Sequence, residues 1–129
     1  MSWVAAVILL ALIEYMVFGM LVGRARARYG IAAPAVTGHE MFERYFRVHQ
    51  NTLEQLIVFV PAMWAFGVYL SAGWAAGIGM VFVIGRIFYA VGYVREPTRR
   101  ELGAGLSFLP TIVLIIGAVI GVVRDLLGA

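Results

Sequence analysis

A stretch of 31 residues without a charged side chain, residues 55–85, places the strongest limit on how this chain can fold. A helix needs about 20 consecutive apolar residues to cross the hydrocarbon core of a membrane. The stretch is therefore too long for one comfortable span and too short for two. Residues 3–22 and 104–123 are also apolar, and each segment is long enough for one span. The chain is thus expected to be an integral membrane protein.

The composition excludes several other classes of protein. Hydrophobic residues make up 63% of the chain and charged residues 13%, whereas a soluble domain is about 45–50% apolar and about 25% charged. Such a chain cannot cover a soluble domain with polar side chains, and its hydrophobicity excludes disorder. Because it has no cysteine, a disulfide framework, a cysteine-based metal site and a thiol nucleophile are excluded. All ten basic residues are arginine and the net charge is +3, but arginines set among apolar spans make a poor surface for nucleic acid.

The uncharged stretch is best explained as parts of two helices. The small residues at 71–73 predict a tight turn. With four spans, the arginine clusters at residues 24–47 and 95–100 fall on the same side of the membrane, whereas three spans would separate them, against the positive-inside tendency. We therefore expect an all-α, four-helix membrane bundle in one domain, residues 1–129, with both arginine-rich connections in the cytoplasm and both termini on the opposite side. The expected spans are residues 3–22, 42–70, 74–93 and 104–123.

A polar stripe lies on the second expected helix. Four of its side chains fall within roughly an 80° arc: Arg44, Arg47, Asn51 and Glu54. One explanation is a solvated helix end with ion pairs between successive turns. However, the stripe continues directly into the apolar part of the same helix, where an uncompensated charge is costly. This position favours a ligand site or a contact between helices.

A second stripe lies on the third expected helix, where Arg86, Tyr89 and Tyr93 are spaced by three and four residues. An arginine so close to an uncharged stretch needs a partner, and Glu14 or Glu54 is a candidate. The alternative is an aromatic belt at the membrane interface with one snorkelling arginine. Both stripes and the loop arginines surround one end of the bundle, which suits a small polyanionic ligand: arginines would bind carboxylates, Glu54 would accept from an ammonium group, and tyrosine hydroxyls would complete the hydrogen bonds.

The two stripes together resemble a known family. The pattern is Glu43-Arg44-x-x-Arg47-x-x-x-Asn51-x-x-Glu54, followed by Arg86-x-x-Tyr89-x-x-x-Tyr93-x-Arg95. It is similar to the MAPEG family, the membrane-associated proteins in eicosanoid and glutathione metabolism, which includes microsomal glutathione transferases and leukotriene C4 synthase. The likeness runs from about residue 24 to about residue 100, and the four-span plan covers the remainder. It implies a bacterial-type member, located in the inner membrane and assembled as a homotrimer.

The resemblance also assigns roles to individual residues. Family members bind glutathione between neighbouring subunits near the cytoplasmic face. One subunit would contribute Arg47, Asn51, Glu54, Tyr89 and Tyr93. The adjacent subunit would contribute Arg26 and Arg100. Arg100 matches the arginine that activates the thiol, although a shift of one residue would exchange it with Arg99. Supporting roles fall to Arg44, Arg86, Arg95 and His49, and no metal is implied.

The chemistry of glutathione agrees with these assignments. Glutathione carries a thiol, two carboxylates and one ammonium group, and the pKa of its thiol resembles that of free cysteine, about 8.5. A nearby guanidinium favours the thiolate and keeps its own charge, so it stabilises the anion and does not act as a base. The thiolate would attack a hydrophobic electrophile arriving from the bilayer, or reduce a lipid hydroperoxide. The expected activity is that of a membrane-bound glutathione transferase acting by proximity and electrostatic stabilisation.

Several positions depart from the pattern of leukotriene synthases. Gln55 stands where those enzymes have a tyrosine, His49 replaces a glutamine, Ala27 replaces an arginine, and Ile112 replaces an aromatic residue that caps the lipid tail. These departures disfavour leukotriene synthesis and favour a general conjugating enzyme. Glu14 is expected to pack inside the bundle or at the trimer axis.

Two other functions compete with the transferase. A non-catalytic member of the family would bind lipid or partner proteins, but the complete set of Arg47, Asn51, Glu54 and Arg100 argues for an enzyme. A small channel or transporter subunit is disfavoured because the charges gather at one membrane face and do not line a path across it. The host would supply glutathione or another small thiol as the co-substrate.

Overall fold

Four long helices make up the described part of the chain. The computed structural model describes residues 1–96, 98 and 100–128, without the side chains of residues 100–102. The helices are α1 (Ser2–Tyr29), α2 (Glu40–Tyr69), α3 (Ala72–Arg95) and α4 (Arg100–Leu126). Each contains a segment long and apolar enough to cross a membrane. The described residues therefore confirm the expected all-α architecture, with four helices long and apolar enough to span a membrane.

The helices end where local sequence favours an end. Gly30 closes α1 in the left-handed conformation (φ 68°), which glycine adopts without steric cost. The α2 helix begins after His39, whose Nδ1 accepts a hydrogen bond from the Met41 amide at 3.1 Å. The predicted break is present but lies at residues 70–71, because Ala72 and Gly73 already belong to α3. The Ser71 hydroxyl caps α3 by accepting a hydrogen bond from the Trp74 amide at 3.2 Å.

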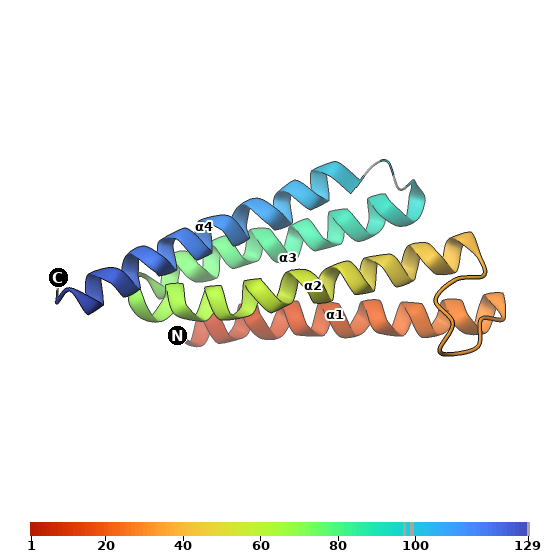
Figure 1. Ribbon diagram of the computed structural model, residues 1–129, viewed down its shortest axis with the longest axis horizontal. Coiled ribbons are helices and arrows are strands. Elements are labelled where there is room, and N and C mark those ends of the chain that lie inside the picture. Colours follow the sequence, from red (N-terminus) through yellow and green to blue (C-terminus); the bar gives the residue numbers. More distant parts are fainter. Residues whose placement is uncertain (97, 99, 129) are drawn as a thin grey trace.

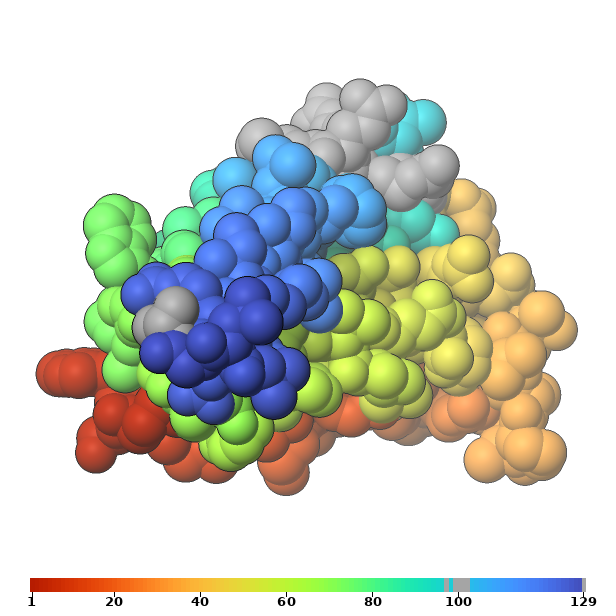
Figure 2. All heavy atoms as spheres, turned by 60° about the vertical axis from the view of Figure 1, so that its left-hand side comes forward, coloured from red at the N-terminus to blue at the C-terminus, as the bar shows by residue number. Residues whose placement is uncertain are grey.

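The helices run antiparallel and form a bundle with α2 and α3 at its centre. Helix α1 packs on α2 and α3, and α4 packs on the same two helices. Both chain termini and the short α2–α3 turn lie at one end, and the two longer connections lie at the other (Figure 1). In the space-filling view, α1 (red) lies along the lower edge and α4 (blue) lies above it (Figure 2). The arginine-rich connections therefore share one end of the molecule.

The core is apolar and joins all four helices. At its centre the rings of Phe59 and Phe82 stack with centroids 3.8 Å apart, and Val7, Ala11 and Leu114 pack in the same buried cluster. Large apolar side chains also cover the outside of the helices. A soluble domain rarely exposes so extensive an apolar surface, whereas a bilayer accommodates it. The protein is therefore an integral membrane protein.

Candidate functional site

A polar pocket of about 380 Å³ opens near the arginine-rich end of the bundle, where α2, α3 and α4 meet. Its lining consists of Arg47, Asn51 and Gln55 from α2, Arg86, Tyr89 and Tyr93 from α3, and Ala104 and Phe108 from α4. The structure thus brings the second predicted stripe together with part of the first. The α4 residues and Gln55 were not among the predicted site residues.

Close packing of α4 against α3 shapes this pocket. Gly103 lies against the backbone of Tyr89, and a methyl group at this position would overlap the backbone nitrogen and Cα of that tyrosine. Small residues permit such close approaches between membrane helices. The approach places the first turns of α4 beside the polar part of α3, so that Ala104 and Phe108 reach the pocket.

Arg86 is buried in the wall of the pocket, with 1% of its surface exposed. Its Nη2 donates a hydrogen bond of 2.7 Å to the Thr52 hydroxyl, which in turn donates to the Val48 carbonyl, also at 2.7 Å. The guanidinium lies 4.3 Å from the centroid of the Tyr89 ring, within the range of a cation–π interaction. A threonine and a tyrosine therefore hold this charge in one position.

The partner of Arg86 differs from the one expected. In the described part of the chain, neither Glu14 nor Glu54 comes within ion-pair distance of the guanidinium. Both carboxylate oxygens of Glu14 are buried without a hydrogen-bond partner among the described residues. We therefore correct the expected partner of Arg86 from a carboxylate to the Thr52 hydroxyl. Thr52 lies one turn after Val48 on α2 and faces α3. No sequence signal marked this threonine.

Two predicted ligand residues lie outside the pocket of a single chain. Glu54 is exposed on α2 and does not line the pocket. Arg26 remains on the α1 side, where its Nη1 donates to the Ala35 carbonyl at 2.7 Å and its guanidinium lies 4.9 Å from the Phe42 ring. Among the predicted glutathione ligands whose side chains the structure describes, one chain therefore brings together Arg47, Asn51, Tyr89 and Tyr93.

The supporting residues have separate environments. Arg44, on α2, caps the C-terminal end of α3: its Nη1 donates to the carbonyls of Val94 at 2.9 Å and Arg95 at 3.2 Å. Its Nη2 forms an ion pair with Glu40. Arg95 is exposed and borders an apolar groove on another face. The His49 ring stacks on Tyr15 with centroids 4.3 Å apart, at the contact between α1 and α2.

The predicted thiol-activating arginine cannot be placed in this geometry. The side chain of Arg100 and all of Arg99 lie outside the described residues. The described residues form no group of three histidine, aspartate or glutamate side chains that would hold a metal ion. The chemistry that the pocket offers is therefore that of two guanidinium groups, two phenols and two side-chain amides around a polar cavity with one aromatic wall on α4.

Comparisons with known proteins identify relatives along nearly the whole chain. The model of the MAPEG family matches residues 4–120. An uncharacterized protein of Synechocystis sp. is 44% identical over 124 residues, which cover 96% of this chain and 90% of that protein. Microsomal glutathione S-transferase 2 of Mus musculus is 40% identical over 121 residues, covering 94% and 82% of the two chains. Leukotriene C4 synthase of Bos taurus is 30% identical over 125 residues, covering 97% and 83%.

Proposed function

The chain belongs to the MAPEG family, and from that premise we propose that it is a glutathione transferase that joins the glutathione thiolate to hydrophobic electrophiles. The observation that carries this proposal is the single pocket on which Arg47, Asn51, Arg86, Tyr89 and Tyr93 converge. Two relatives are named for glutathione transfer and leukotriene C4 synthesis. Reduction of lipid hydroperoxides by the same thiolate is proposed as a second activity.

The pocket suits the functional groups of glutathione. Arg47 supplies a guanidinium group, which binds carboxylates through charge-assisted hydrogen bonds, while the buried Arg86 supports the wall of the pocket. The rings of Tyr89 and Tyr93 stack with centroids 5.7 Å apart, so both phenols are presented from one face of α3. A volume of about 380 Å³ falls within the range of small-molecule sites, about 300–1,000 Å³. The electrophile would reach the thiolate from the bilayer, past Phe108.

We propose that the site is completed by a second copy of the chain in a homotrimer. Glu54 lies roughly 20 Å along α2 from its first residue, and it is exposed in the single chain. A carboxylate facing lipid near the apolar part of a span is costly, so a neighbouring subunit is expected to cover it. That neighbour would contribute Arg26 and Arg100, with Arg100 stabilising the thiolate. The proposed orientation puts this end of the bundle in the cytoplasm and both termini on the other side of the bacterial inner membrane.

The proposal is tested with protein purified in detergent, glutathione and a chromogenic electrophile. Arg47→Ala is expected to weaken glutathione binding about tenfold or more, because a hydrogen bond to a charged group contributes about 1.5–3 kcal/mol. Arg100→Ala is expected to abolish turnover while glutathione still binds, and turnover that survives would move the role to Arg99. Arg124→Ala, at the opposite end of the bundle, is the matched control. If the wild-type protein neither binds glutathione nor turns over, the alternative of a non-catalytic lipid- or partner-binding protein replaces this proposal.

A further inference from the structure

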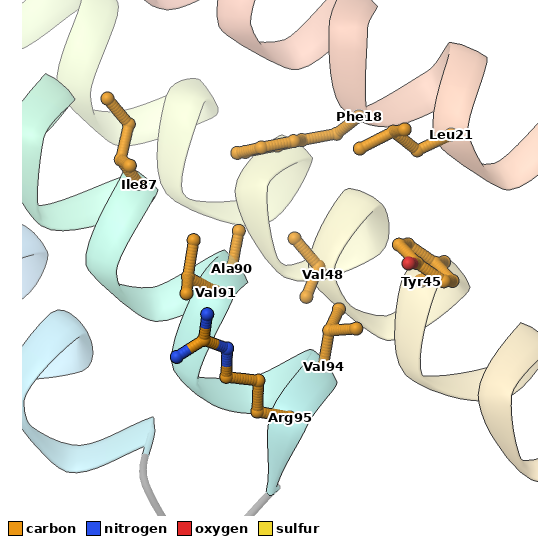
Figure 3. A pocket seen from close by; sticks show the side chains of 9 residues that line it. All are labelled: Phe18, Leu21, Tyr45, Val48, Ile87, Ala90, Val91, Val94 and Arg95. Carbon is orange, nitrogen blue, oxygen red and sulfur yellow. The ribbon is translucent and has the colours of Figure 1, made fainter.

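An apolar groove of about 320 Å³ lies between α1 and α3, with α2 as its floor. Its lining consists of Phe18, Leu21, Tyr45, Val48, Ile87, Ala90, Val91, Val94 and Arg95 (Figure 3). Among the residues that the structure describes, it shares no lining residue with the polar pocket. On α3, the residues that line the two cavities lie on faces roughly 130° apart around the helix axis. The groove is therefore separate from the proposed glutathione site.

The groove continues into a small basic pocket. This pocket, of about 90 Å³, shares Leu21 and Tyr45 with the groove and is also lined by Arg24 and Arg28. Tyr45 therefore stands at the junction between an apolar cavity and a pair of arginines. Both arginines lie in the last two turns of α1, at the end of the bundle that carries the connecting loops (Figure 1).

A third arginine borders the groove from the other side. Arg95 occupies the last turn of α3, and its side chain runs back along the helix so that the guanidinium lies beside Val91 (Figure 3). Arg24, Arg28 and Arg95 are all exposed. Among the described residues, none of the three has a carboxylate within ion-pair distance, and neither cavity has an acidic side chain in its lining. The positive charge at this end of the groove is thus available to an anion.

The apolar and the basic parts of the groove lie at the levels of the membrane that the two parts of a lipid occupy. Ile87 and Val91 expose 51% and 48% of their surface and lie on a helix that is long enough to span the membrane, so this part faces hydrocarbon. The arginines lie at the ends of α1 and α3, where the chain leaves the apolar region. An occupant must therefore be apolar along the groove and anionic at its end.

We propose that this groove binds one anionic phospholipid per chain. An acyl chain would lie along Phe18, Ile87 and Val91, and the phosphate would bind Arg24 and Arg28, with Arg95 completing the charge. Guanidinium groups form bidentate hydrogen bonds with phosphate oxygens, and the net negative headgroup distinguishes this lipid from a zwitterionic one of the same chain length. A water-soluble anion would leave the apolar groove empty.

The first experiment measures lipid retention by the full-length protein. Delipidated protein is mixed with phosphatidylglycerol or phosphatidylcholine of identical acyl chains, and bound lipid is counted by native mass spectrometry. We expect one phosphatidylglycerol per chain to be retained in preference to phosphatidylcholine. In Arg24→Gln and Arg28→Gln this preference should fall by about fivefold for each arginine removed, whereas Arg124→Gln should keep it. Equal retention of both lipids by the wild type, or an unchanged preference in the double variant, would overturn the proposal.

The second experiment tests the apolar part of the groove. Val91→Trp fills it from an exposed position, so retention of both lipids should fall, and Val119→Trp on the exposed surface of α4 is the matched control. Retention that is the same in the two variants would refute the groove as the site of the acyl chain. A change in the mass of the assembly in Val91→Trp would show that another copy of the chain covers the groove, and would likewise refute the proposal. Arg24 and Arg28 are not among the residues that line the polar pocket, so Arg24→Gln and Arg28→Gln should leave glutathione turnover unchanged. A failed lipid result therefore remains distinct from a failed transferase.

Discussion

Replacing Thr52 with valine tests how the buried charge in the pocket wall is held. Thr52 is fully buried and makes two hydrogen bonds, one to the carbonyl of its own helix and one from Arg86. Valine keeps the branched shape of threonine but removes both. The Val48 carbonyl belongs to a helix that already supplies an amide donor, so that loss is small. The guanidinium, in contrast, loses its hydrogen-bond partner in a position that water does not reach.

The cost can be worked out from the kinds of hydrogen bond involved. A hydrogen bond to a charged group contributes about 1.5–3 kcal/mol, and one between neutral groups about 0.5–1.5 kcal/mol. Thr111 is the matched control, because it is also buried and its hydroxyl donates to the Ser107 carbonyl at 3.0 Å, but no arginine donates to it in the described residues. Both variants lose the bond from the hydroxyl to a carbonyl of the same helix, so we expect the free energy of unfolding to fall about 1.5–3 kcal/mol more in Thr52→Val than in Thr111→Val, which is the contribution of the bond from Arg86.

The assay is reversible unfolding in mixed micelles with increasing SDS, followed by circular dichroism. Thr52→Ser keeps the hydroxyl and loses only a methyl group, so it should recover most of the difference. Thr52→Val should also lower glutathione affinity, because it leaves the guanidinium of Arg86 free to reorient at the border of the pocket. Thr52→Ser should recover that affinity. Equal losses of stability in Thr52→Val and Thr111→Val would refute the conclusion that Thr52 holds this charge.

Further predictions concern the packing that forms the pocket. Gly103→Ala should lower both the stability and the glutathione affinity, because the added methyl group overlaps the Tyr89 backbone. Gly105→Ala is the control: its new methyl group has open space around it, so stability should rise by up to about 1 kcal/mol. A Gly103→Ala variant as stable as the wild type in SDS unfolding would contradict the close approach of α4 to α3. Arg44→Gln should lower the free energy of unfolding by about 1.5–3 kcal/mol, since it removes the charge that binds the last carbonyls of α3. Hydrogen exchange at the end of α3 should rise in that variant, and unchanged protection there would refute the capping role of Arg44.

Several features of the fold and of the polar pocket could be predicted from local properties of the sequence. The number of helices and the break near Ser71 could be predicted because the length of an apolar segment and the small residues of a turn are local features. The grouping of Arg47 with Asn51, and of Tyr89 with Tyr93, also followed from helical periodicity alone. Four residues that line the polar pocket could thus be grouped on their helices before the helices were placed relative to one another.

The sequence by itself therefore determined the spans and the polar stripe on each helix, and the tertiary structure decided which stripes meet and what each charge touches. Arg86 and Thr52 are 34 residues apart, and Arg44 and Val94 are 50 apart, so both contacts depend on how each helix is rotated about its axis. The apolar residues of α1 and α3 surround the whole helix, so their pattern does not reveal which face is inside. Close packing, such as that of Gly103 on Tyr89, sets that rotation, and it produced the polar pocket on one face and the groove between α1 and α3 on another.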